Sequence, residues 1–167
     1  MEIYVYSKKF LKSKWYSDMD YFRNANRYFI SIAGLADGCE FPCPYLTKDS
    51  KRVLHLLFDD ITEQYFSNNP YDMSVILFNK DEAKKIHDFI NTVPKNAELV
   101  VNCAAGISRS GAVGYVLNQW FNSDNDTDFK MFFVRNSQIQ PNPTVKRILQ
   151  YELFGEPDYS NVFKNIE

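Results

Sequence analysis

The residues best suited to chemistry lie in one short stretch, where a cysteine is followed six residues later by an arginine. Cys103 ends an apolar run, and five mostly small residues separate it from Arg109 and Ser110. Small residues allow successive backbone amides to turn inward and bind an anion, and a guanidinium matches two phosphate oxygens at once. Such donors favour the nucleophilic thiolate form of a thiol. The stretch therefore predicts a phosphate-binding loop with a nucleophile at its base.

The segments on either side indicate how this loop is positioned. Residues 98–101 are an apolar run typical of a buried strand, and residues 112–121 are long and apolar enough for a buried helix. A helix that begins after the loop adds its positive end to the anion site, and a glycine in the loop permits backbone angles that a side chain would resist. We expect the phosphate oxygens to contact the following loop residues: Ala104, Ala105, Gly106, Ile107, Ser108 and Arg109.

A pair of acids follows the next candidate strand, at residues 53–58. The run ends in Asp59-Asp60-Ile61. Parallel strands bring their carboxyl ends to one edge of a sheet, so these acids are expected beside the phosphate loop. An acid there can protonate the leaving oxygen and later accept a proton from water. Alignment on the strand favours Asp60, with Asp59 as the alternative, although the pair could instead cap a helix that begins at residues 62–63.

The string Cys103-x5-Arg109-Ser110 resembles the signature of the cysteine-dependent protein tyrosine phosphatases, and its Ala-Gly-Ile-Ser-Arg-Ser wording is most similar to the dual-specificity branch. The hydrophobic-Asp-Asp-Ile sequence resembles the acid loop of that branch. In this family a hydroxyl after the arginine helps the thiolate leave, a role that the resemblance gives to Ser110. Pro141-Asn142 before a final helix also resembles a family pattern, which supports the fold and says little about chemistry.

The resemblance covers residues 28–154 of what we expect to be a single domain over residues 1–167. It implies a three-layer α/β fold, with a central, mostly parallel sheet of four or five strands and helices on both faces. The implied reaction is hydrolysis of a phosphomonoester through a cysteinyl-phosphate, without metal or cofactor. The implied substrate is a phosphorylated protein or another phosphomonoester, and the neutral loop residues favour protein or aryl phosphates.

One departure from the family pattern leaves alternatives open. Asn102 stands where the family usually has histidine. Asparagine can hydrogen-bond backbone groups and hold the loop, but it cannot carry charge. The alternatives are a phosphate-binding pseudophosphatase with little turnover, a polynucleotide 5′-phosphatase and a sulfur-transfer enzyme.

Composition excludes several other classes. A net charge of −2 gives no broad basic surface, so nucleic acid is not indicated as a partner. No apolar stretch is long enough to cross a membrane and no signal peptide is evident, so no membrane partner is expected. Three irregularly spaced cysteines argue against a disulfide framework, and a reactive thiol suits the reducing cytoplasm.

Three further expectations concern segments outside these motifs. Cys39 and Cys43 lack a second pair of metal ligands, so we expect two half-buried cysteines in a turn rather than a metal site. The alternative is that one of them is a redox partner for Cys103. Residues 63–72 are polar and predict a loop. Met131, Phe132 and Phe133 are expected in the core, and the residues after Gly155 as a short tail.

Overall fold

Four parallel strands form the centre of the chain in a computed structural model, which describes residues 1–155. The expected tail after Gly155 lies outside the described residues. The strands are β1 (Glu2–Ser7), β2 (Arg27–Ala33), β3 (Val53–Leu57) and β4 (Glu98–Cys103). They lie in the order β1-β4-β2-β3, so β4 is flanked by β1 and β2. The cysteine at the end of β4 is therefore central in the sheet.

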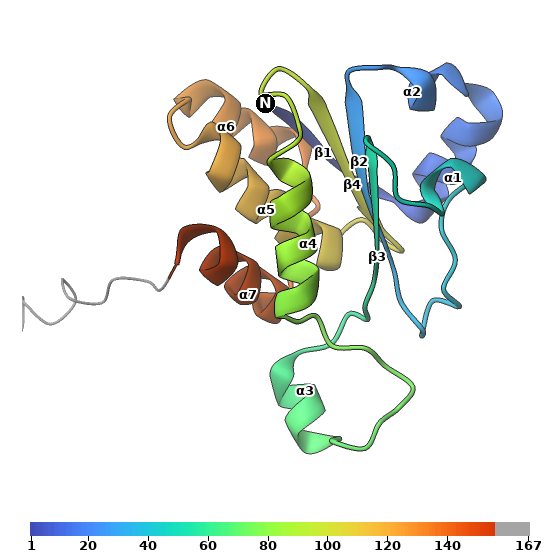
Figure 1. Cartoon of the computed structure of the whole chain (residues 1–167), viewed down its shortest axis with the longest axis vertical. Coiled ribbons are helices and arrows are strands. Elements are labelled where there is room, and N and C mark those ends of the chain that lie inside the picture. Colours follow the sequence, from blue (N-terminus) through green and yellow to red (C-terminus); the bar gives the residue numbers. More distant parts are fainter. Residues whose placement is uncertain (156–167) are drawn as a thin grey trace, which may run out of the picture.

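Helices cover both faces of this sheet (Figure 1). One face carries α4 (Lys80–Ile90), α5 (Arg109–Asn122), α6 (Asp126–Arg135) and α7 (Pro143–Phe154). The other face carries α1 (Lys8–Ser17), α2 (Asp20–Arg23) and the 3-10 turn η1 (Pro44–Leu46). The expected three-layer α/β architecture with a parallel sheet is confirmed. No helix within residues 1–155 has the length and hydropathy needed to cross a bilayer.

Side chains of the strands supply two separate cores. Ile30 and Ile32 pack with the helices of the α5 face, whereas Phe29 packs with Leu11 and Phe22 on the α1 face. Successive residues of a strand point to opposite faces, so a strand covered on both sides is apolar almost throughout. This explains the continuous apolar runs that predicted β3 and β4.

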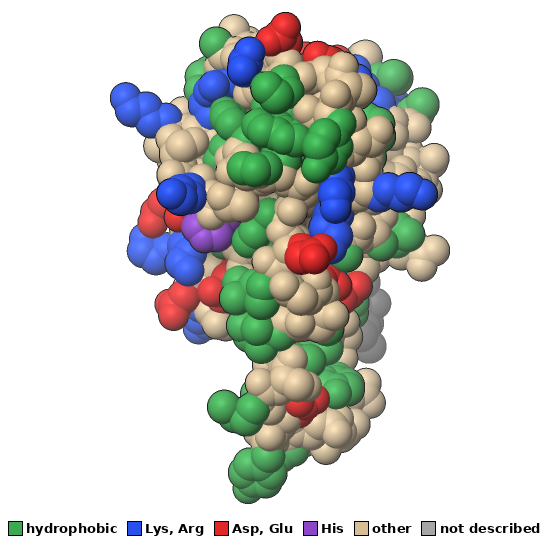
Figure 2. All heavy atoms as spheres, turned by 90° about the vertical axis from the view of Figure 1, so that its right-hand side faces the viewer, with side chains coloured by type: hydrophobic (Ala, Val, Ile, Leu, Met, Phe, Trp, Pro, Cys, Tyr) green, Lys and Arg blue, Asp and Glu red, His purple; other side chains and the backbone are tan. Residues whose placement is uncertain are grey.

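The expectation of a loop over residues 63–72 was wrong at its start. Helix α3 (Glu63–Asn68) begins there, because Thr62 Oγ1 accepts a hydrogen bond from the Tyr65 amide and caps the helix. The segment that contains α3, residues 63–73, projects from the body of the molecule, and hydrophobic side chains gather at its end (Figure 2). Tyr71 and Met73 in this segment are 91% and 90% exposed.

The expectation that Met131, Phe132 and Phe133 all lie in the core was wrong for two of these residues of α6. Phe132 is buried, but Met131 and Phe133 are 36% and 38% exposed. Neighbouring residues of a helix point about 100° apart. Three consecutive side chains therefore cannot all face the sheet.

Candidate active site

The loop between β4 and α5 is fixed at the end of the sheet by neighbouring backbone. The Lys8 amide donates to Ala104 O at 3.1 Å, and the Gln140 amide donates to Ile107 O at 3.0 Å. Gly106 has a φ of +72°, and a Cβ added there would lie 2.5 Å from Ser7 N. The loop therefore packs directly on the end of β1, and only glycine fits at this point.

Cys103 lies at the base of this loop with two polar neighbours. Its side chain is buried, at 2% exposure. The Gly106 amide donates to Cys103 Sγ at 3.3 Å, and Ser110 Oγ lies 3.0 Å from the same sulfur. The loop thus brings together the predicted nucleophile and the predicted helper hydroxyl.

Arg109 is the first residue of α5, and its buried guanidinium turns back toward the sheet edge. Nη1 donates to Phe58 O at 3.1 Å, and Nη2 lies 2.6 Å from Asp37 Oδ2. Nε has no hydrogen-bond partner among the described residues. A guanidinium has five N–H groups in a fixed fork. Asp37 and Phe58 therefore fix the orientation of Arg109 and leave donors for an oxyanion.

Asp37 is a site residue that the sequence analysis missed. It follows β2, which lies beside β4 in the sheet. The rule that parallel strands end at one edge placed Asp59 and Asp60 near the phosphate loop. The same rule applied to residues 34–38, after the strand at 27–33, would have made Asp37 a candidate.

The two acids after β3 lie in different environments. Asp59 is 2% exposed, and its carboxylate accepts the Ala36 amide at 2.9 Å and the Ile76 amide at 2.7 Å. Asp60 is exposed, and its Oδ1 accepts the Ser108 hydroxyl at 2.7 Å. Asp59 thus joins two loops, while Asp60 contacts the phosphate loop itself. This geometry favours Asp60 for proton transfer.

Asn142 connects the acid loop to α7. Its Nδ2 donates to Asp60 Oδ1 at 2.8 Å and to Ile61 O at 3.1 Å. Its Oδ1 caps α7 by accepting the amides of Thr144 and Val145. The Pro141-Asn142 pattern was expected to support only the fold. Its asparagine also holds the candidate acid in position.

Asn102 does not hold the loop in the way expected from its type. Its side chain is buried, and neither Oδ1 nor Nδ2 has a hydrogen-bond partner among the described residues. It lies in register with Ser31 of β2, whose buried hydroxyl is also unpartnered. Backbone contacts and Ser110, rather than the Asn102 amide, therefore shape the loop.

The other two cysteines lie in the segment after β2. Cys39 is exposed, whereas Cys43 is buried in the core of the α1 face. Burial raises the pKa of the Cys43 thiol, which favours its neutral form. Cys103 belongs to the core of the opposite face. Within residues 1–155, no group of three or more His, Cys, Asp or Glu side chains could hold a metal ion.

Comparison with known proteins assigns no family to the chain. No family model matches it, and no curated protein matches it. The functional argument therefore depends on the geometry of the site.

Proposed function

We propose that the chain is a metal-independent phosphomonoester hydrolase, similar to the dual-specificity branch of the protein tyrosine phosphatases. One observation carries the proposal: three groups lie at the β4–α5 loop. They are the buried sulfur of Cys103, the buried guanidinium of Arg109, whose Nε has no partner among the described residues, and the exposed carboxylate of Asp60, which contacts the loop. These are the nucleophile, the oxyanion donor and the proton donor that phosphoryl transfer requires. The proposed substrate class is phosphorylated protein or an aryl phosphate, in the cytoplasm.

In the first half-reaction, the Cys103 thiolate attacks phosphorus. The S–P bond forms as the bond from phosphorus to the leaving oxygen breaks, and Asp60 gives its proton to that oxygen. Arg109 and the loop amides hold the three equatorial oxygens as their charge redistributes. Asp60 enters this step protonated and leaves it as carboxylate.

In the second half-reaction, water attacks the cysteinyl-phosphate. Asp60 accepts a proton from the water, the S–P bond breaks and inorganic phosphate leaves. Ser110 Oγ, 3.0 Å from Cys103 Sγ, can donate a hydrogen bond to the departing thiolate. Both residues return to their starting protonation states.

The direct test compares Cys103→Ser with the matched variant Cys43→Ser, using p-nitrophenyl phosphate as substrate. We expect the Cys103 variant to lose activity by a factor of about 10³ or more, because serine is far less ionised than cysteine. The Cys43 variant should retain turnover, since that thiol lies in the other core. Full turnover by Cys103→Ser would exclude the mechanism.

A phosphate-binding protein with little turnover is the second candidate, and Asn102 is the observation that favours it. Asn102, the residue before Cys103, is neutral, and its side-chain amide makes no hydrogen bond within residues 1–155. This candidate predicts that a phosphotyrosine peptide binds without being hydrolysed, and that Asn102→His restores turnover. Rapid hydrolysis by the unaltered chain would exclude it.

A further inference from the structure

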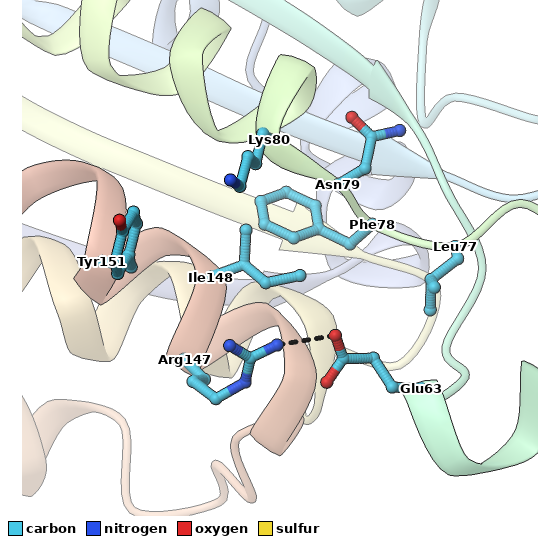
Figure 3. Close-up of a pocket in the computed structure, with 8 residues that line it drawn as sticks. All are labelled: Glu63, Leu77, Phe78, Asn79, Lys80, Arg147, Ile148 and Tyr151. Atoms are coloured by element: carbon cyan, nitrogen blue, oxygen red, sulfur yellow. Dashed lines mark hydrogen bonds and ion pairs between the residues drawn. The ribbon is translucent and has the colours of Figure 1, made fainter. Parts of the chain in front are cut away.

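A cavity of about 450 Å³ lies between α7 and the start of α4, next to the first residue of α3 (Figure 3). Its apolar lining includes Leu77, Phe78 and Ile148, and Tyr151 adds an aromatic ring. Cavities of this size and lining hold small organic ligands. It shares no lining residue with the phosphate loop or its acids, so it is a separate site.

The charges around this cavity are unbalanced. Among the lining residues of the described part of the chain, Arg147 and Lys80 are the cations and Glu63 is the only carboxylate. Arg147 Nη2 lies 2.6 Å from Glu63 Oε1, at the side of the cavity in Figure 3. Lys80 Nζ lies 5.6 Å from the centre of the Tyr151 ring and forms no ion pair with a carboxylate of residues 1–155. One positive charge therefore remains without an acidic partner beside an apolar surface.

We propose that this cavity binds a small amphipathic anion, an aromatic or aliphatic carboxylate. Its apolar body would cover Phe78 and Ile148, and its carboxylate would bind Lys80 and Arg147. A planar guanidinium pairs best with a carboxylate in a two-point contact. The ligand carboxylate therefore competes with Glu63 for Arg147.

Short contacts connect the segment of Glu63 and the acid loop to the start of α7. The Glu63 amide donates to Thr144 Oγ1 at 3.0 Å, and Asn142, two residues earlier on the same helix, binds Asp60. The Glu63–Arg147 ion pair is a further contact between this segment and α7. An anion on Arg147 removes that contact and leaves the hydrogen bonds of Thr144 and Asn142 in place. Binding itself does not depend on the proposed phosphatase activity.

The experiment titrates 2-naphthoate into the full chain and measures its affinity by calorimetry, with amide shifts in NMR spectra to locate it. We expect saturable binding with shifts at residues 77–80 and 147–151. Arg147→Gln and Lys80→Gln should each weaken binding about tenfold, the loss of one charged contact. Glu63→Gln should strengthen it several-fold, because the competing carboxylate is gone. The uncharged 2-naphthamide should bind at least tenfold more weakly than 2-naphthoate.

The matched control is Lys84→Gln, which removes an exposed cation of α4 that pairs with Asp88 outside the cavity lining. It should leave the affinity for 2-naphthoate unchanged. The altered side chains at Lys84, Arg147 and Glu63 are at least half exposed, so the fold should tolerate them. No detectable binding would overturn the proposal. Equal affinities of the chain and its Arg147 and Lys80 variants would overturn it too, as would shifts confined to the phosphate loop.

Discussion

Arg109 is a buried cation whose orientation depends on two oxygen atoms of other segments. A guanidinium at 4% exposure is costly without compensation, and Asp37 supplies the opposing charge at 2.6 Å. The Phe58 carbonyl oxygen accepts a hydrogen bond from a second nitrogen of the guanidinium, Nη1. In the proposed mechanism Asp37 is therefore a positioning residue, which would act on the oxyanion through Arg109.

Replacement of Asp37 by alanine tests this role. We expect the variant to bind tungstate, a tetrahedral dianion, about tenfold more weakly, because the ion pair that orients Arg109 is lost. The tungstate affinity of Asp37→Asn should lie between those of the unaltered chain and of Asp37→Ala, since the amide oxygen can still accept a hydrogen bond from Arg109. The matched control is Glu40→Gln in the same loop, which removes an exposed pair with Lys8 and should leave tungstate affinity within about twofold. Tighter binding by Asp37→Ala would show that the carboxylate competes with the anion instead.

The two neighbouring aspartates should respond differently to the same change. Asp60→Asn removes the exchangeable proton, and we expect hydrolysis of phenyl phosphate, which has a poor leaving group, to slow by about 10²-fold or more. Asp59→Asn should instead lower the free energy of unfolding by about 2 kcal/mol, because a buried charged acceptor of two amides is replaced. Steady-state rates and urea unfolding of both variants separate the roles. Asp60 is not the proton donor if Asp59→Asn keeps the stability of the unaltered chain but hydrolyses phenyl phosphate slowly, while Asp60→Asn hydrolyses it at the full rate.

The proposed anion site depends on one element, the β4–α5 loop. β4 brings Cys103 to the sheet edge, and α5 begins at Arg109, so the loop spans only residues 104–108. Gly106 allows this short path, because its positive φ and missing Cβ let the loop touch the end of β1. The loop is thus held in part by neighbouring backbone, at the end of β1 and at Gln140.

Two glycines with similar positive φ angles provide a comparison. At Gly106, with φ +72°, alanine adds both strain and a clash with Ser7 N, and we expect the free energy of unfolding to fall by about 2–5 kcal/mol. At Gly155, with φ +79°, an added Cβ meets nothing of residues 1–155 within 4 Å, so the cost should be about 1 kcal/mol from strain alone. Urea unfolding measures both, and Gly106→Ala should also lose tungstate binding. Equal costs at the two positions would mean that the packing of the loop on β1 contributes little.

The elements that could be predicted from the sequence are those whose signals are local. The apolar run before Cys103, the small residues after it and the apolar helix that follows predicted β4, the loop and α5. The acids at the end of β3 were likewise evident. These segments needed no knowledge of strand order.

The features that were not predicted have several causes, although the strand-end rule applied to residues 34–38 would have found Asp37. Asp37 meets Arg109 only because β2 lies beside β4, and Asn142 meets Asp60 across 82 residues. Helix α3 depends on the single cap at Thr62, a weak signal within a polar segment. The side-chain environment of Asn102 follows from packing, not from residue type.

At the scale of the whole molecule, the site gathers segments from across the described chain. Asp37 follows β2, Asp60 follows β3, and the loop follows β4 and contacts the end of β1. Asn142 adds the start of α7. The proposed anion would therefore contact a loop that is supported by the strand ends and by the start of α7.

Anion binding should therefore stabilise the whole fold. At a concentration one hundred times its Kd, tungstate should raise the free energy of unfolding by about 2.7 kcal/mol. For a chain of this size that corresponds to a rise in Tm of about 5–10 °C. Thermal unfolding with tungstate, and with chloride at equal ionic strength, measures the effect. Equal Tm values in the two salts would contradict a formed anion site.

The most direct test of the central claim is to trap the covalent intermediate. The chain is mixed with p-nitrophenyl phosphate, quenched in acid within milliseconds and digested, and the peptides are mapped by mass spectrometry. Our account predicts one added phosphoryl group on the peptide that contains Cys103, with more of it accumulating in Ser110→Ala because the thiolate leaves more slowly. Hydrolysis that proceeds without any phosphoryl group on Cys103, in either protein, would contradict it.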